Sequence, residues 1–487
     1  MRSRMVTVNR SPHVLLPDSS RVLALPFFPG EANFGGDRSR VDLIIERIQA
    51  LSDEEVDREV DRVAASFAGR HRDIEATWER HAERAADVAP AVDDLSPNRR
   101  RLAGMAFTQE YAFESTAVCN PSIASVGEEA PDGTLEFVMT VRSIGEGHLS
   151  SISFRTGRVS ADGKVELDEV SPWAQHGTRR SGRFDSSIFR TRLQEMRVDN
   201  DLSNRVLDDL GPEFTLEDLE IALARLAESD VPAALRFETE RAMHWLAASN
   251  YEVQFGDIPI SERVLSPAAP VESRGMEDAR LVRFVDDDGS ERYYATYTAY
   301  DGFEALPQLI ETTDFQSFKV ATLTGACARS KGIALFPRKI QGDYVALART
   351  DNESTFVMRS DHVRRWEVAE LVLRPSEPWE LIQAGNSGSP LETPEGWLVI
   401  MHGVGPMREY VLSAVLLDLE EPTKLVARMR EPLLVPEDPE RNGYVPNVVY
   451  SCGALLHGDV LVVPYGFADY GVRIATMSLS DVLDAMD

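Results

Sequence analysis

The chain has 487 residues, 43% of them hydrophobic, which is enough to supply one large core or several smaller ones. It carries 51 basic and 80 acidic residues, a formal net charge of −29, and such a surface repels nucleic-acid phosphates. No apolar run reaches the length of a membrane-spanning helix, so we expect neither a nucleic-acid nor a membrane partner.

The cysteines are few and odd in number: Cys119, Cys327 and Cys452. This usage is typical of reduced thiols rather than of a disulfide framework. The chain starts with Met-Arg-Ser-Arg and lacks the continuous apolar segment of a secretory signal. We therefore expect a cytoplasmic protein. Neither cysteines nor histidines show metal-ligand spacing, so we expect no metal.

The N-terminal part predicts helices over residues 39–90. Apolar residues recur there at helical spacing, at Val41, Ile44, Ile45, Ile48 and Leu51. Ser52 and Glu55 form the capping-box pattern of a second helix. Residues 1–105 thus read as a largely helical extension. Because apolar stripes must be buried, we expect these helices to pack on the rest of the chain and contribute to a homo-oligomer.

From about residue 106 the pattern changes to short β-rich runs separated by Gly, Asp and Pro. The runs are Phe137–Val141, Ile152–Phe154, Tyr293–Tyr300, Tyr344–Ala348, Trp397–Met401, Val411–Leu417 and Val460–Tyr465. Such spacing predicts a sandwich, barrel or propeller, although no clean repeat of 40–50 residues is visible. A helical pattern at about 200–250 predicts an insertion into this β domain.

One motif carries most of the chemistry. Arg274-Gly-Met-Glu-Asp-Ala-Arg280 is followed by an aromatic strand pattern that ends in Asp301-Gly302. Carboxylates beside aromatic rings suit a carbohydrate, because carboxylates hold hydroxyls and move protons while rings stack on sugar faces. From the residues alone, Glu277 and Asp278 are better explained as turn caps that pair with Arg274 or Arg280.

Six further segments occur in the same order as the motifs of one known enzyme family. They are Cys119-Asn-Pro-Ser-Ile123, Gly145-Glu-Gly-His148, Lys331 with Ala334-Leu-Phe-Pro337, Gly385-Asn-Ser-Gly-Ser-Pro390, His402-Gly-Val-Gly405, and the run from Val445 to Asp469. Together with the acidic motif they resemble glycoside hydrolase family 130, the β-mannoside phosphorylases and their β-mannosidase relatives. The resemblance implies an all-β fold, a five-bladed β-propeller over residues 106–487, with the helical extension and insertion added.

The resemblance also implies the reaction. Asp278 would be the catalytic acid, acting through a sugar hydroxyl, while inorganic phosphate attacks from the opposite face. The products would be α-mannose 1-phosphate and a shortened acceptor, with phosphate as co-substrate and no cofactor. The implied partner is a β-mannoside oligosaccharide. The substrate-binding residues would be Asn120, Glu277, Arg280, Tyr300, His402 and Asp469.

Each of these residues has a structural alternative. Asn120 would form an Asx-type turn before Pro121. His402 would be a hydrogen-bonded core histidine, and Asp469 would cap a loop. Tyr300 would belong to the core, as most tyrosines in strands do.

Phosphate requires fixed cations, and the candidates are Arg142, Arg155, Lys331 and Arg349. The family often places a His-Arg pair where this chain reads Leu347-Ala-Arg349, so that histidine is missing. Three functions therefore stay open. They are a β-mannoside phosphorylase, an inverting β-mannosidase that uses water, and a non-catalytic carbohydrate-binding propeller.

Overall fold

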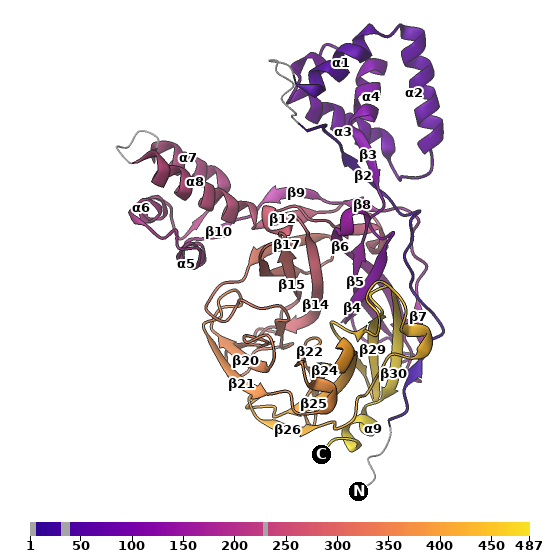
Figure 1. Ribbon diagram of the computed structural model, residues 1–487, viewed down its shortest axis with the longest axis vertical. Helices are drawn as coiled ribbons and strands as arrows, with labels where there is room; N and C mark the ends of the chain where they lie inside the picture. Colours follow the sequence, from indigo (N-terminus) through magenta and orange to yellow (C-terminus); the bar gives the residue numbers. More distant parts are fainter. Residues whose placement is uncertain (1–5, 31–38, 227–231) are drawn as a thin grey trace. The chain divides into compact units, whose positions relative to one another are not determined.

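The computed structural model describes residues 6–30, 39–226 and 232–487. The chain divides into two compact units (Figure 1). The helical unit comprises Asp18–Ser115 and Ser171–Gln175, and the sheet unit comprises Met1–Pro17, Thr116–Val170 and His176–Asp487. Parts of the predicted extension (1–5, 31–38) and insertion (227–231) lie outside the described residues, and the predicted boundary near residue 105 stays a prediction.

The helical unit confirms the helices predicted over 39–90. Its helices are α1 (Arg40–Ala50), α2 (Asp53–Phe67), α3 (Ile74–Ala86) and α4 (Pro97–Ala106), and its strands β2 (Leu23–Pro26) and β3 (Thr108–Tyr111) pair antiparallel. The capping box of Ser52 and Glu55 opens α2. The apolar stripes pack into the unit's own core, with Ile45, Val56 and Trp78 buried. The stripes are thus covered within one chain, and the homo-oligomer stays a prediction.

The sheet unit begins with two antiparallel meanders that belong to one large sheet. The first contains β4 (Ala117–Val126), β5 (Leu135–Ile144), β6 (Ser150–Val159) and β7 (Val165–Leu167). The second contains β14 (Gly275–Val285), β15 (Glu291–Tyr300), β16 (Ala305–Thr312) and β17 (Ser317–Thr322). A single parallel pairing of Gly275 with Ser150 joins them, and short strands extend the sheet: β9 (Thr178–Ser181), β12 (Tyr251–Gln254) and β13 (Arg263–Leu265).

Three further antiparallel sheets follow in chain order (Figure 1). One is β18 (Ala334–Leu335), β19 (Tyr344–Ala348), β20 (Thr355–Ser360) and β21 (Val368–Leu373). The next is β22 (Gln383–Asn386), β23 (Leu391–Thr393), β24 (Gly396–Val404), β25 (Tyr410–Leu417) and β26 (Leu425–Arg428). The last is β27 (Val449–Tyr450), β28 (Leu455–His457), β29 (Val460–Phe467) and β30 (Gly471–Ser478). The predicted β-rich runs are confirmed as strands.

The last sheet takes one edge strand from the start of the chain. β1 (Asn9–Arg10) pairs antiparallel with β30, and Asn9 faces Thr476. The Nε of Arg10 donates to the hydroxyl of Tyr465 at 3.2 Å. That hydroxyl in turn donates to the buried carboxylate of Glu440 at 2.6 Å. Backbone pairing and a buried hydrogen-bond chain thus both fasten β1 to the sheet.

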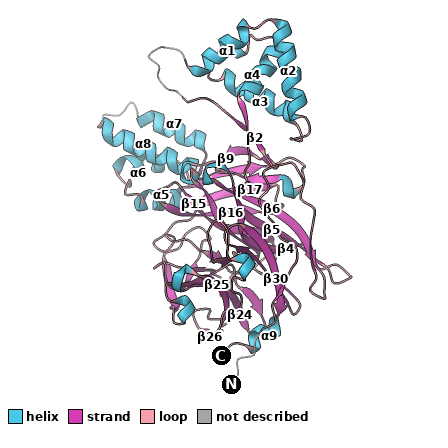
Figure 2. Cartoon of the chain, turned by 45° about the vertical axis from the view of Figure 1, so that its right-hand side comes forward, coloured by secondary structure: helices cyan, strands magenta, loops and turns pink. Residues whose placement is uncertain are grey.

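The predicted helical insertion is present but begins before residue 200. It contains α5 (Ser186–Glu195), α6 (Asp201–Asp209), α7 (Leu216–Leu226) and α8 (Ala233–Ala248), drawn as one cluster in Figure 2. Asp185 caps α5 by accepting from Ser187 and Ile188. Phe189 packs with Phe184 and Phe214 in the cluster's core. No helix among the described residues is long and apolar enough to cross a membrane.

A recurring turn precedes the first strand of three meanders. Each is a 3-10 turn with a buried glutamate at its end: Pro270–Glu272, Pro378–Glu380 and Asp438–Glu440. The carboxylate accepts from backbone N–H groups at the turn's start. Glu272, for example, accepts from Ala268 and Ala269 at 2.8 and 2.9 Å. These turns satisfy buried backbone donors and set where β14, β22 and β27 begin.

Candidate active site

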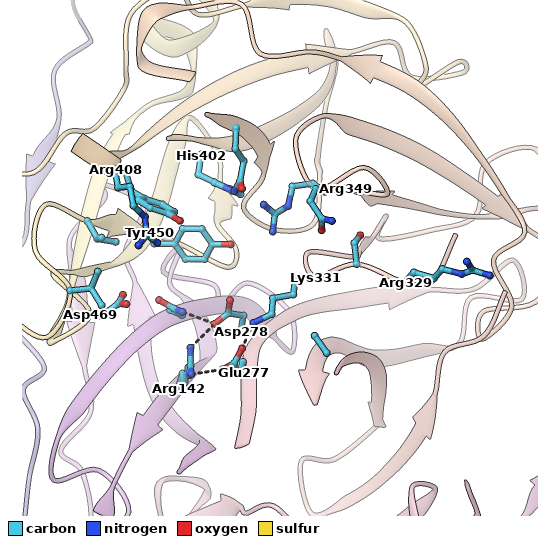
Figure 3. Close-up of a pocket in the computed structure, with 18 residues that line it drawn as sticks. Arg142, Glu277, Asp278, Arg329, Lys331, Arg349, His402, Arg408, Tyr450 and Asp469 are labelled. Carbon is cyan, nitrogen blue, oxygen red and sulfur yellow. Dashed lines mark hydrogen bonds and ion pairs between the residues drawn. The ribbon is translucent and has the colours of Figure 1, made fainter. Parts of the chain in front are cut away.

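A pocket of about 510 Å³ lies in the sheet unit and receives side chains from all five meanders. The volume is within the usual range of ligand sites. Eight of the side chains predicted from sequence line it (Figure 3). They are Asn120, Arg142, Glu277, Asp278, Lys331, Arg349, His402 and Asp469.

Irregular backbone positions three of these side chains. β14 has a bulge between Glu277 and Arg280, and Asp278 within it adopts a φ of 57°. β4 has a bulge after Cys119, where Asn120 adopts a φ of 48°. Asp469, in the turn between β29 and β30, has a φ of 45°. Left-handed conformations cost energy in residues other than glycine and gather at functional sites, where bulges re-aim side chains.

The acidic side of the pocket is a connected network. The amide of Asn120 donates to Oδ1 of Asp278 at 2.5 Å. Arg142 donates to Oε1 of Glu277 at 2.7 Å and lies 3.5 Å from Oδ1 of Asp278. Lys331 donates to Oε2 of Glu277 at 2.6 Å. Arg142 and Lys331 are therefore engaged by carboxylates, whereas the structural alternative for this motif had paired the acids with Arg274 or Arg280.

The network controls the ionisation of Asp278. Burial alone would raise the pKa of this carboxyl, but Arg142 and Arg280, the hydrogen bond from Asn120, and Lys331 outweigh burial and lower the pKa. Asp278 is therefore an ionised carboxylate at neutral pH when no ligand is bound. Before it can act as an acid, some change in the site must return a proton to it.

The pKa of Asp469 is shifted in the opposite direction. Burial raises its pKa to about 6; the nearby carboxylates of Asp278 and Glu277 act in the same direction, and Arg142 only partly offsets them. Two carboxyls of one pocket thus differ in proton affinity, an arrangement typical of sites that perform acid–base chemistry.

We expect Asp469→Asn to stabilise the protein above pH 6. The folded protein disfavours ionisation of Asp469, so ionisation of this carboxyl lowers the free energy of unfolding. This loss of stability is absent below the unfolded pKa near 3.8, grows between that value and the folded pKa of about 6, and is complete above the folded pKa. The gain at pH 8 should be about 3 kcal/mol. Thermal unfolding of Asp469→Asn and wild type at pH 8 and pH 4 measures it. The fully exposed Asp438, changed to Asn, is the control, and an equal shift at both pH values would contradict the assignment.

The basic side of the pocket centres on Arg349, which is 9% exposed. Within the described part of the chain, no hydrogen bond or ion pair engages its guanidinium, and its Nε is buried without a partner. In Figure 3, Arg349 and His402 lie across the pocket from Asp278 and Glu277. Burial, with Arg349 and Arg280 nearby, lowers the pKa of His402 well below its usual value, so the imidazole is neutral at pH 7.

Two glycines make room for Arg349. A Cβ on Gly385 would lie 2.3 Å from Cδ of Arg349 and 2.9 Å from Cε1 of His402. A Cβ on Gly332, whose φ is +95°, would lie 3.1 Å from Nε of Arg349. Only glycine fits at such close approach. The chain therefore holds a buried cation in a defined place where, among the described residues, no carboxylate pairs with it directly, which is costly unless an anion binds there.

Comparison with known proteins agrees with this chemistry. A family model described as β-1,4-mannooligosaccharide phosphorylase matches residues 257–487. A 1,2-β-oligomannan phosphorylase of Thermoanaerobacter sp. is 36% identical over 231 residues, which cover 46% of this chain and 75% of the relative. This chain belongs to glycoside hydrolase family 130.

Two further likenesses come from Listeria innocua. Its β-1,2-mannobiose phosphorylase is 32% identical over 231 residues, 46% of this chain and 63% of the relative. A solved structure of a β-1,2-mannobiose phosphorylase from Listeria innocua aligns over 76% of this chain and 92% of that one, with 22% identity and a TM-score of 0.46. The family-model match excludes β4 and β5, although these strands supply Asn120 and Arg142 to the pocket.

Three residues expected from the family 130 resemblance do not line the pocket. Arg280 is fully buried, and it donates to the hydroxyl of Tyr450 at 2.8 Å and to the carbonyl of Asp278 at 3.1 Å. The hydroxyl of Tyr300 donates to Gly302, and its ring lies 5.7 Å from Nζ of Lys331. Arg155 donates to Ser153 and to the carbonyl of Phe154. Arg280 and Tyr300 contact lining residues, whereas the structure places Arg155 away from the pocket, and its phosphate role stays a prediction.

Other lining residues were missed from the sequence. They include Arg329, Gln383, Arg408 and Tyr410. Arg408 in the β24–β25 hairpin and His148 in the β5–β6 hairpin occupy equivalent positions. Both hairpins start at a glycine and carry left-handed residues. Aligning Gly145-Glu-Gly-His148 with Gly405-Pro-Met-Arg408 would have drawn attention to Arg408. Among the described residues, no cluster of three His, Cys, Asp or Glu side chains suits a metal ion.

Proposed function

We propose that this family 130 member is a β-mannoside phosphorylase, which cleaves its substrate by inverting phosphorolysis. The names of the relatives support the reaction class. The single observation that carries the proposal is the buried Arg349, unpaired by any carboxylate of the described residues, across the pocket from Asp278. A water nucleophile has no use for such a cation, whereas a phosphate dianion requires one.

Each side of the pocket takes one role in this proposal. Asn120, Glu277 and Asp469 hold hydroxyls of the terminal mannose. Phosphate binds to Arg349, with His402 and Lys331 as further donors. A phosphate oxygen forms a bond to the anomeric carbon, the bond from that carbon to the glycosidic oxygen breaks, and the leaving oxygen takes a proton that originates from Asp278, relayed through a sugar hydroxyl. The product is α-mannose 1-phosphate.

Phosphate also supplies a reason for Asp278 to be protonated. In the free site, Arg142, Arg280 and Lys331 keep its pKa low. A dianion bound to Arg349 and Lys331 in the same pocket offsets the field of these cations, so the pKa of Asp278 rises when phosphate binds. Asp278 is therefore protonated, and able to act as an acid, only when phosphate is bound. This coupling favours phosphorolysis over loss of the sugar to water.

The five meanders support a five-bladed β-propeller as part of this proposal. Each meander contributes to one pocket, and β1 pairs with β30 of the last sheet, as expected if the meanders are the blades of a closed ring. The helical extension and insertion are additions to that ring. The free thiols of Cys119, Cys327 and Cys452 support a reducing, cytoplasmic location.

Hydrolysis is the second candidate because of one residue. Asp469, with a pKa raised to about 6, is suited to act as a general base for water. The missing histidine beside Arg349 points in the same direction. Against it, the neutral His402 lies close to Arg349, since a single Cβ on Gly385 would approach both side chains, and it can supply the donor that the family's histidine would give.

One experiment separates these candidates. The protein is incubated with β-1,2- and β-1,4-linked mannobiose and longer mannosides, with and without inorganic phosphate, and mannose is resolved from mannose 1-phosphate. The proposal expects cleavage only with phosphate and α-mannose 1-phosphate as the product. Free mannose released at full rate without phosphate would establish the hydrolase instead.

A further inference from the structure

One loop of the sheet unit brings three consecutive side chains to the pocket. The loop covers residues 323–333, between the end of β17 and the start of β18, and we call it the lysine loop. Its residues Arg329, Ser330 and Lys331 line the pocket (Figure 3). Lys331 also donates to Glu277 at 2.6 Å. The conformation of the lysine loop therefore decides where this ammonium group stands in the pocket.

Hydrogen bonds and close packing anchor the lysine loop at both ends. Near its end, the carbonyl of Gly332 accepts from the side chain of Asn386 at 2.9 Å. At its start, the carbonyl of Thr324 accepts from the backbone N–H of Trp366 at 2.8 Å. Gly325 follows with a φ of +107°, and a Cβ there would lie 2.3 Å from the carbonyl oxygen of Trp366. Backbone this close leaves room only for glycine.

The helical insertion supplies a further anchor at the start of the loop. Gly325 is buried, and its N–H donates to the carboxylate of Glu195, the last residue of α5. The second oxygen of that carboxylate accepts from Arg192 at 2.6 Å. The two side chains are mostly buried, with Glu195 16% and Arg192 11% exposed. A carboxylate at the C-terminal end of a helix opposes the helix dipole, and the contact with Gly325 offsets that cost.

The two oxygens of Glu195 serve different parts of the chain. The insertion has an apolar core of its own, which includes Phe189 and Leu193 of α5. One oxygen of Glu195 stays within α5 through Arg192. The other reaches Gly325, 130 positions further along the chain. This second contact joins the insertion to the lysine loop.

We propose that Glu195 is a positioning residue for Lys331, so that the helical insertion takes part in phosphate binding from outside the pocket. This inference rests on the proposed function and deepens it. The carboxylate satisfies a buried backbone donor at the start of the loop, and Lys331 follows six residues later, directly before the anchor at Gly332. With both ends fixed, the ammonium group meets Glu277 and phosphate in one place. When the first anchor is lost, the same group is spread over several positions.

The test compares Glu195→Ala with Glu220→Ala. Glu220 belongs to the same insertion and pairs with His244 at 3.0 Å, so it is the matched control. We expect Glu195→Ala to raise the KM for phosphate about fivefold and to leave kcat within about twofold, because the lysine is kept and only its position is lost. Glu195→Gln should stay near wild type, since its amide oxygen still accepts from Gly325. The control should change neither constant.

A double-variant cycle separates positioning from a general loss of stability. If Glu195 acts through Lys331, then Glu195→Ala should change the KM for phosphate less than about twofold in a Lys331→Ala background. The same change of about fivefold in both backgrounds would overturn the inference. A KM for phosphate in Glu195→Ala equal to that of the control would also overturn it.

A second measurement does not depend on catalysis. Amide hydrogen exchange of the intact chain, read by mass spectrometry, should be faster across residues 323–333 in Glu195→Ala and unchanged in Glu220→Ala. Unchanged exchange in both would refute the anchor. If no mannoside is cleaved with phosphate, the proposed function fails separately, and the exchange result alone decides whether Glu195 holds the loop. If Glu195→Ala does not fold, Glu195→Asp, which is shorter by one methylene, replaces it in every measurement.

Discussion

Turnover should fall at least about 100-fold when Asp278 is replaced by Asn, in line with the usual contribution of a general acid. The amide has the size of the carboxyl, and its oxygen still accepts the hydrogen bond that Asn120 donates at 2.5 Å. It cannot supply the proton that the leaving oxygen needs. Initial rates of α-mannose 1-phosphate formation at saturating substrate and phosphate measure the effect.

The control for this variant is Asp286→Asn. Asp286 pairs with Lys339 at 2.8 Å and does not line the pocket. Both variants should retain the circular dichroism and thermal unfolding of a folded protein. Turnover of Asp278→Asn within a few fold of wild type would remove Asp278 from the mechanism.

Arg349→Ala should raise the KM for phosphate about 100-fold and leave the KM for the mannoside within about twofold. A charge-assisted hydrogen-bonding partner of a buried dianion is worth roughly 3 kcal/mol, and each 1.4 kcal/mol is tenfold. Lys331→Ala should be less selective, since Lys331 also binds Glu277 at 2.6 Å, and removing it disturbs the sugar side. Steady-state kinetics with each substrate varied in turn separate the two effects.

Two variants sharpen this test. Gly385→Ala keeps every charge but places a Cβ 2.3 Å from Cδ of Arg349, so it should raise the KM for phosphate by displacing the guanidinium. Arg338→Ala removes a cation that pairs with Glu392 outside the pocket and should change neither KM. Equal KM values for phosphate in Arg349→Ala and Arg338→Ala would disprove the anion site.

Local periodicity explains why the elements were predictable. The apolar spacing of Val41, Ile45 and Ile48 has the period of a helix, and these residues are buried on one face of α1. The alternation over Tyr293–Tyr300 has the period of a strand and falls within β15. Such patterns depend only on neighbours along the chain, so the sequence displays them directly.

The repeat was invisible for a physical reason. The recurring part is the turn that ends in Glu272, Glu380 or Glu440, where a buried carboxylate caps the backbone. The strands between these turns need only be apolar and pleated, so their sequences diverge. The helical insertion also lies between β7 and β14, so the first two meanders are more widely separated along the chain than the others. Only a search for the cap itself would have found the pattern.

The site was partly predictable because its acids and bases lie in short motifs. Sequence could not distinguish cations already bound to carboxylates, such as Arg142, from Arg349, which has no such partner. That distinction depends on which strands meet across the pocket. The bulge that gives Asp278 a φ of 57° was equally hidden, because the same residues fit an ordinary strand or a turn.

The strand β1 has a consequence for how the protein is made. Asn9 leaves the ribosome well before its partner Thr476, which lies 467 residues further along the chain. At roughly 5–20 residues per second, the N-terminal strand waits for tens of seconds before its sheet exists. Until then β1 has no partner strand, and an unpaired strand invites pairing with other chains. Completion of the last sheet therefore requires β30 to have been synthesised, so a chain still under synthesis, or one cut before β30, is the form most exposed to aggregation.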